Sequence, residues 1–202
     1  MCQQIFFLRH GETTVRGVLL GQRIDVPLSE EGRRQAHTWA AVLRGVPFRV
    51  IVTSPALRAR QTAEPFLGSG VTSLSLPHFH EISWGTWEGK SYEELAPVLG
   101  KQREAWAAGE VDYAAPEGES LRALLDRAHA GLQLITSLYP TGSLLIITHG
   151  QLLRALFCSL FGYPIAEQNR FHHKRGQLSW LVHLPEGHFY LRTLATDASS
   201  PF

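Results

Sequence analysis

The sequence predicts an α/β protein in which a mostly parallel sheet lies between layers of helices. Short apolar runs alternate along the chain with amphipathic, helix-like segments. The runs are continuously apolar, which is typical of strands buried on both faces. Three of them end abruptly in polar residues, as strands do where a ligand binds at their carboxyl ends. The chain of 202 residues fits one domain, so we expect residues 1–202 to form a single unit.

Composition narrows the classes of protein to consider. Hydrophobic residues make up 44% and charged residues 18%, which excludes global disorder. The net charge of +1 gives no basic surplus, so we expect no nucleic-acid partner. The apolar run near the start is too short for a leader or a membrane span. Cys2 and Cys158 lie in no metal or redox spacing. We therefore expect a cytoplasmic protein without a membrane partner.

The first elements follow from apolar runs and capping residues. Gln4–Leu8 is a buried strand, and it leads into the polar sequence Arg-His-Gly-Glu. Ser29 is placed to cap a helix that ends near Gly45. Val50–Thr53 is a second buried strand. Ser54-Pro55 then predicts a helix with Ser at the N-cap and Pro at the first helical position.

The middle of the chain is less regular. Thr72–Leu76 is a weaker strand. Residues 77–119 follow with an interrupted pattern that contains helix-like pieces at Tyr92–Leu99 and Lys101–Ala108. A long excursion inside a small domain is more often functional than a plain linker, so we expect it to act like a lid.

The second half repeats the alternation of strand and helix. Its expected elements are a helix over 121–138, a strand over Leu144–Thr148, a helix over Leu152–Phe161, and strands over Leu178–Leu184 and Phe189–Thr196. The connection Pro185–His188 contains Pro and Gly, which indicates a hairpin.

Basic residues gather where the three polar strand ends are expected to meet. The predicted cluster contains Arg9, His10, Arg58 and His149. Two guanidiniums and two imidazoles form an anion pocket, because the planar Arg fork donates two hydrogen bonds to a phosphate. Gly11 and Gly150 allow the backbone to approach a ligand closely, and helix starts beside the pocket would aim free N–H groups at it.

Four ordered motifs carry a family resemblance. They are Leu8–Thr13 (LRHGET), Thr53–Ala63 (TSPALRARQTA), Glu81–Gly89 (EISWGTWEG) and Thr148–Gly150 (THG). In this order and at these distances they resemble the signature of the histidine phosphatase superfamily, the phosphoglycerate mutase-like proteins. The resemblance implies a three-layer α/β/α sandwich of the phosphoglycerate mutase-like kind.

The resemblance also implies roles for the clustered residues. His10 would be the nucleophile that takes the phosphoryl group, with its other ring nitrogen held by a backbone carbonyl. Arg9, Arg58 and His149 would bind the phosphoryl oxygens and stabilise the group during transfer. Gly150 would add a backbone donor. With these cations in place, the resemblance implies neither a metal nor a cofactor.

An acid is needed to protonate the leaving group. The resemblance assigns this role to Glu81, which would then deprotonate the attacking water. Glu88 lies close by in sequence, so a structural role for Glu81 stays open. Glu12 is expected to form structural hydrogen bonds.

Other residues are candidates for contacting the substrate. The family often shows Trp-Asn shortly after His-Gly-Glu, and that Asn touches the phosphate; residues 13–17 here contain neither. Arg16 is expected to replace this contact or to point to solvent. Gln22 and Trp84 are further candidates, although the aromatic residues are expected mainly to pack beneath the lid. A short loop of this kind is also seen in family members similar to α-ribazole phosphatases.

Paired histidines raise the alternative of a metal site. They are His78, His80, His172 and His173. They lack the closed four-ligand set that zinc prefers, so we expect loop or pocket-rim residues and no metal.

The function expected from this resemblance is hydrolysis of a phosphate monoester through a phosphohistidine. The substrate would be a small phosphorylated metabolite; the candidates are α-ribazole 5′-phosphate, phosphoglycerates and sugar phosphates. One alternative is a phosphoglycerate mutase, which resembles this family but carries an arginine pair that Lys90–Gly118 lacks. The other is a non-catalytic phosphate-binding module, which typically loses the first histidine. We expect a monomer or a homodimer.

Overall fold

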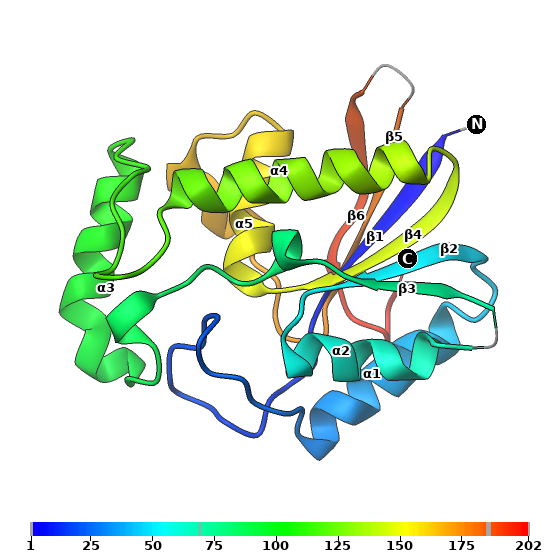
Figure 1. The fold of residues 1–202 in the computed structure, drawn as a ribbon, viewed down its shortest axis with the longest axis horizontal. Coiled ribbons are helices and arrows are strands. Elements are labelled where there is room, and N and C mark those ends of the chain that lie inside the picture. Colours follow the sequence, from blue (N-terminus) through cyan, green and yellow to red (C-terminus); the bar gives the residue numbers. More distant parts are fainter. Residues whose placement is uncertain (1, 69, 185–186, 202) are drawn as a thin grey trace.

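A mixed sheet of six strands forms the centre of the computed structural model, which describes residues 2–68, 70–184 and 187–201 (Figure 1). The strand order is β3-β2-β4-β1-β5-β6. The strands are β1 (Gln3–Arg9), β2 (Phe48–Thr53), β3 (Thr72–Ser75), β4 (Gly142–Thr148), β5 (Leu178–His183) and β6 (Phe189–Thr196). β1 to β4 pair in parallel, whereas β5 and β6 add antiparallel strands at one edge. The predicted α/β fold is confirmed.

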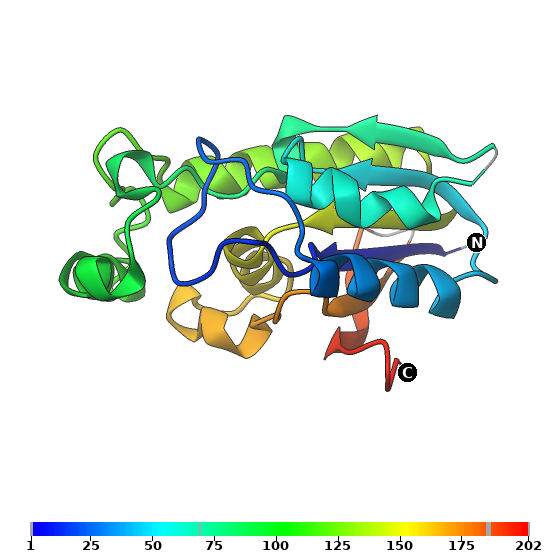
Figure 2. The same ribbon diagram turned by 90° about the horizontal axis from the view of Figure 1, so that it is seen from below.

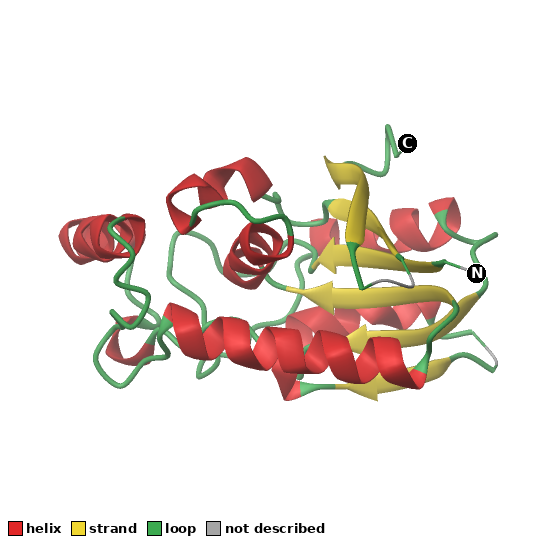
Figure 3. Cartoon of the chain, turned by 90° about the horizontal axis from the view of Figure 1, so that it is seen from above, coloured by secondary structure: helices red, strands yellow, loops and turns green. Residues whose placement is uncertain are grey.

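Helices cover both faces of the sheet (Figures 2 and 3). The helices are α1 (Glu30–Val42), α2 (Leu57–Ala63), α3 (Tyr92–Ala107), α4 (Leu121–Leu138) and α5 (Gly150–Leu160). Successive residues of a strand face opposite sides, so Phe6 packs with α1 and α2 whereas Phe7 packs with α4 and α5. α3 lies beyond the carboxyl ends of β1 and β4 (Figure 1).

Local capping differs from the sequence prediction at α2. The helix begins at Leu57 and follows Ala56, so Ser54 is not its N-cap. The buried Ser54 hydroxyl instead accepts the Ala56 N–H at 3.2 Å and lies 2.7 Å from Nε2 of His149. The Ser54 side chain therefore links the residues that follow β2 to His149, the residue that follows β4. Ser29 does cap α1, accepting the N–H of Gly32 at 3.1 Å.

Two further boundaries differ from expectation. The two helical pieces predicted in residues 92–108 form the single helix α3, which contains Pro97. A 3₁₀ segment at Ile165–Phe171, between α5 and β5, was not predicted. β5 and β6 pair antiparallel as predicted, but Pro185 and Glu186 of the expected turn lie outside the described residues. Within the part of the chain that the structure describes, none of the helices is long and apolar enough to cross a membrane.

Candidate active site

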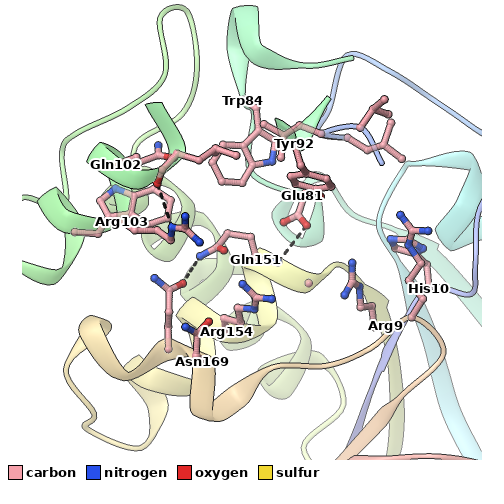
Figure 4. A pocket seen from close by; sticks show the side chains of 18 of the residues that line it. Arg9, His10, Glu81, Trp84, Tyr92, Gln102, Arg103, Gln151, Arg154 and Asn169 are labelled. Carbon is pink, nitrogen blue, oxygen red and sulfur yellow. Dashed lines mark hydrogen bonds between the residues drawn. The ribbon is translucent and has the colours of Figure 1, made fainter. Parts of the chain in front are cut away.

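The carboxyl ends of three neighbouring strands form one end of a pocket of about 360 Å³. β2, β4 and β1 are adjacent in the sheet, so the residues that follow them meet there. Arg9, His10, Arg58, Glu81, Gly150 and Arg175 line this end, which we call the inner half. Figure 4 shows Gln102, Arg103 and Asn169 at the opposite end from His10, with Arg154 between. These four residues define the outer half.

His10 is buried and held in one orientation. Its Nδ1 lies 2.8 Å from the Gly11 carbonyl, which only accepts, so Nδ1 carries the proton and donates. Its backbone N–H donates to the Thr148 carbonyl at 3.0 Å. Burial, and then the charges of Arg58 and Arg9, lower the pKa of His10 well below its usual value. The ring is therefore neutral at pH 7, and Nε2 keeps a free lone pair.

His149 stands beside His10, with 5.1 Å between the ring centroids. Its Nε2 contacts the Ser54 hydroxyl, whereas its buried Nδ1 has no hydrogen-bond partner among the described residues. Burial, followed by Arg58, lowers the pKa of His149 well below its usual value. The ring of His80 stacks on the other side at 5.8 Å. His149 is fully buried and, unlike Arg9, His10, Arg58 and Glu81, is not among the residues that line the pocket. Ser54 fixes one of its ring nitrogens, which leaves Nδ1 for any contact with a ligand.

Arg9 is held by backbone atoms. One terminal nitrogen donates to the His173 carbonyl at 2.6 Å, and the buried Nε finds no partner within the described ranges. Burial lowers the pKa of Arg9 to about 10. A Cβ at Gly150 would lie 2.7 Å from Cζ of Arg9, so a glycine is needed at the start of α5 to leave room for the guanidinium.

Arg58 projects from the first turn of α2, as predicted, and is buried. Its guanidinium donates to the Gly21 carbonyl at 2.9 Å and lies 3.9 Å from a carboxylate oxygen of Asp25. Burial lowers its pKa, which Glu81 and Asp25 partly oppose. Asp25, which lies outside the four motifs, is thus an acid beside the cationic cluster. The Nε of Arg58 is buried and unpartnered in the described part of the chain.

Glu81 belongs to the residue-77–119 excursion and contacts the start of α5. Its Oε1 accepts the N–H groups of Ile82 (3.0 Å) and Leu152 (3.1 Å), and its Oε2 accepts that of Gln151 (3.1 Å). Two first-turn N–H groups of α5 therefore hold this carboxylate and are not free for an anion, contrary to the sequence expectation. Gln22 donates to the Glu81 carbonyl at 2.7 Å and so positions its backbone.

Glu88, the neighbouring acid, has a structural role. Its carboxylate accepts backbone N–H groups of Gln22, Arg23, Ile24 and Trp84 at 2.7–3.2 Å. These bonds tie the loop before Asp25 to the excursion. Glu81 lines the pocket and Glu88 does not.

The structure places only one of the three candidate substrate-contact residues in the pocket lining. Arg16 is 71% exposed, pairs with Glu12 and does not line the pocket, so it does not replace the family's asparagine here. Gln22 also lies outside the lining and acts on Glu81. Trp84 does line the pocket, and its ring lies 6.2 Å from that of Trp106, a second lining residue.

The paired histidines are structural or flank the site. The described residues contain no cluster of three or more metal-ligating side chains. The His173 ring lies 2.6 Å from the Ser179 hydroxyl, and its carbonyl holds Arg9. His80 accepts the Glu81 N–H on Nδ1 at 3.0 Å and contacts His149 through its ring.

The sequence analysis missed most of the outer half. None of Gln102, Arg103, Arg154 and Asn169 was predicted as a site residue, although all four line the pocket. Four residues of α3 share one helical face and line the pocket: Leu99, Gln102, Arg103 and Trp106. Arg175, in the loop that braces Arg9 and His10, was also missed.

Comparison with known proteins places this site in a family. A model of the histidine phosphatase superfamily (branch 1) matches residues 5–196. A curated protein named "Probable phosphoglycerate mutase GpmB", from Yersinia pestis (strain Pestoides F), is 33% identical over 180 residues, which are 87% of this chain and 83% of that protein. The chain belongs to the histidine phosphatase superfamily, whose enzymes are of the phosphatase or mutase kind.

Solved structures agree with this assignment. The α-ribazole phosphatase from Shigella flexneri is 25% identical with a TM-score of 0.81, over 96% of both chains. Bacillus stearothermophilus YhfR is 27% identical with a TM-score of 0.85, over 95% of this chain and 96% of the other. The fold is that of the phosphoglycerate mutase-like proteins.

Proposed function

We propose that this protein is a metal-independent phosphomonoesterase that acts through a phosphohistidine on His10. The observation that carries the proposal is the state of the His10 ring. Its Nδ1 donates to the Gly11 carbonyl, so its Nε2 lone pair faces a pocket lined by Arg9 and Arg58. A buried neutral imidazole beside cations suits attack on a phosphate, because the anion supplies the charge that the site lacks.

The first step transfers the phosphoryl group to the enzyme. Nε2 of His10 bonds to phosphorus while the bond to the ester oxygen breaks. Arg9, Arg58 and Nδ1 of His149 bind the equatorial oxygens, and each has a buried nitrogen without a partner in the described residues. The two guanidinium charges are already in place when the transition state forms, and neutral His149 adds a hydrogen-bond donor, so the step needs no metal.

Glu81 supplies the proton that the leaving oxygen needs. Its Oε1 accepts two N–H groups, whereas its Oε2 accepts one and keeps a lone pair for the proton. In the second step a water attacks phosphorus, the bond to Nε2 breaks, and the Glu81 carboxylate takes the proton from that water. Inorganic phosphate leaves, and the starting state returns.

Replacement of His10 tests the proposal. We expect His10→Ala to lower kcat/KM for p-nitrophenyl phosphate by about 10⁴-fold or more, ~5.5 kcal/mol of barrier. His37→Ala is the matched control, because His37 is exposed on α1 and does not line this pocket. A loss of less than about tenfold in His10→Ala would rule out this histidine as the nucleophile.

The cations also predict the response to inhibitors. Activity should survive EDTA and be blocked by vanadate, since a trigonal-bipyramidal oxyanion fits a site built for the transition state. Activity that EDTA removes and magnesium or zinc restores would contradict the metal-independent mechanism.

A phosphoglycerate mutase is the second candidate, and two observations favour keeping it. The Yersinia relative carries that name, whereas the Shigella relative is named as a phosphatase. The sequence argument against a mutase was that Lys90–Gly118 lacks an arginine pair, but Arg103 of this segment lines the same pocket as Arg154. Release of phosphate from 3-phosphoglycerate, without a bisphosphate primer, supports the phosphatase. Interconversion of 2- and 3-phosphoglycerate much faster than phosphate release would replace it with the mutase.

A further inference from the structure

The outer half of the pocket contains donors that the proposed reaction does not use. Arg154 projects from α5 and Arg103 from α3, and both line the cavity (Figure 4). The reaction at His10 needs only the inner half. The outer half therefore has a separate role to explain.

These arginines have no carboxylate partner. Among the residues that the structure describes, neither forms an ion pair within 4.0 Å. Arg103 donates to the Leu99 carbonyl of its own helix at 3.2 Å, and Arg154 contacts a ring nitrogen of His172. The Nε of Arg154 is buried, with no partner in the described ranges. Both guanidiniums retain donors for a ligand.

The positive charges also repel one another. Arg154 is close enough to Arg9 and to Arg103 that like charge lowers the pKa of Arg9 and of Arg154, after burial. Glu81 opposes this effect on both arginines, but its carboxylate is already held by the N–H groups of α5. Grouping cations in a half-buried pocket is costly without an anion. A single phosphate at the inner half leaves the outer arginines uncompensated.

Gln102 provides an independent observation. Its side chain is 1% exposed and lines the pocket, and its Nε2 has no hydrogen-bond partner among the described residues. A buried amide donor without a partner costs roughly 1–3 kcal/mol. Buried polar groups are almost always satisfied in native proteins. A ligand that reaches this end of the pocket and accepts hydrogen bonds would remove the penalty.

We propose that Arg103, Arg154 and Gln102 form a second anion subsite, so that the preferred substrates are small phosphate monoesters bearing a second anionic group. This inference rests on the proposed function of the inner half. Three donor groups and no acceptor-rich partner select a carboxylate or a second phosphate over a hydroxyl. The apolar walls at Trp84 and Leu99 would contact the carbon skeleton, and the cavity volume of about 360 Å³ limits its size.

A matched pair of ligands tests the subsite. 3-Phosphoglycerate and glycerol 3-phosphate share a three-carbon skeleton and differ in a carboxylate against a hydroxymethyl group. Each would compete against p-nitrophenyl phosphate, and the ratio of their inhibition constants measures the preference for the second charge. We expect wild type to prefer 3-phosphoglycerate by at least about tenfold, because one charge-assisted hydrogen bond contributes about that much to affinity.

Substitutions in the outer half test whether its arginines cause the preference for a second anionic group. In Arg154→Gln and in Arg103→Gln the ratio should fall to within about threefold of one. Arg122→Gln is the matched control, because Arg122 pairs with Asp112 on the surface and lies outside the pocket lining; its ratio should equal that of wild type. Fructose 1,6-bisphosphate against fructose 6-phosphate repeats the test with phosphate as the second anion.

Failure of the subsite and failure of the proposed function give different results. A wild-type ratio near one, or a ratio that both pocket variants leave unchanged, overturns the subsite while His10-dependent hydrolysis of p-nitrophenyl phosphate persists. If that hydrolysis survives His10→Ala, the proposed function fails whatever the ratio is. A preference that persists for the bisphosphate pair but not for the carboxylate pair would restrict the subsite to a second phosphate.

Discussion

The inner and outer halves of the pocket are built in different ways. Most inner residues follow β1, β2 or β4, whereas Glu81 and Arg175 come from loops, and backbone carbonyls hold His10, Arg9 and Arg58 in place. Outer residues project from α3, from α5 and, for Asn169, from the 3₁₀ segment at Ile165–Phe171. Both halves keep buried nitrogens without a partner among the described residues. A sheet edge fixes groups that must meet one phosphorus atom, whereas helix side chains adapt to the rest of a substrate. The proposed chemistry and the proposed choice of substrate would thus depend on separate elements.

Among substitutions that test this difference between the two halves, replacement of Glu81 should reduce activity most. Glu81→Gln keeps the shape but cannot deliver a proton, so kcat/KM for an alkyl phosphate should fall about 10³-fold. The loss should be much smaller for p-nitrophenyl phosphate, whose leaving group needs little protonation. A steady-state comparison of the two substrates measures this difference.

Glu88→Gln provides the matched control for that experiment. Glu88 binds four backbone N–H groups outside the pocket, so its replacement should affect thermal stability without changing the leaving-group dependence. Equal losses for both leaving groups in Glu81→Gln would remove Glu81 as the proton donor. The inner half would then need another acid.

Acid should destabilise the fold through its buried neutral histidines, whereas the arginines stay protonated at every acidic pH. Burial lowers the pKa of His10 and His149 well below 6.5, and that of His173 to about 4. Between these values and 6.5 the unfolded chain binds more protons than the native one, so stability is lost as pH falls. Each such histidine contributes up to about 1.4 kcal/mol per pH unit.

Urea unfolding at pH 7, 6 and 5 measures this effect. The free energy of unfolding should decrease by at least about 2 kcal/mol from pH 7 to pH 5. An unchanged free energy would mean that these histidines are protonated in the native state, against the neutral ring on which the mechanism depends.

A smaller effect is expected from Ser54, which fixes His149. Ser54→Ala removes one hydrogen bond and should lower kcat/KM by about tenfold, ~1.4 kcal/mol, with a changed pH profile because His149 is no longer held in one tautomer. Ser120→Ala, which removes the N-cap of α4, should reduce stability by about 1 kcal/mol and leave the profile unchanged. An unchanged profile in Ser54→Ala would show that Ser54 has only a packing role.

The sequence predicted that Arg9, His10 and Arg58 would meet, because they stand next to buried strands with a clear apolar pattern, but it did not predict Arg175. Ser54 was misassigned as a helix cap, since a Ser-Pro pair gives the same local signal whether or not a distant His149 takes the hydroxyl. The outer half was missed for a physical reason. Its residues come from three separate segments, which are α3, α5 and the 3₁₀ segment at Ile165–Phe171, and no apolar strand in the sequence marks the point where they meet.

The central claim is that His10 carries the phosphoryl group, and trapping the intermediate tests it most directly. The enzyme would be mixed with a labelled monoester, quenched in base within milliseconds, and digested for mass spectrometry. We predict an acid-labile, base-stable phosphate on the peptide that contains His10, absent from His10→Ala and present in His37→Ala. Rapid turnover with no such adduct, or an adduct on another residue, would contradict the account.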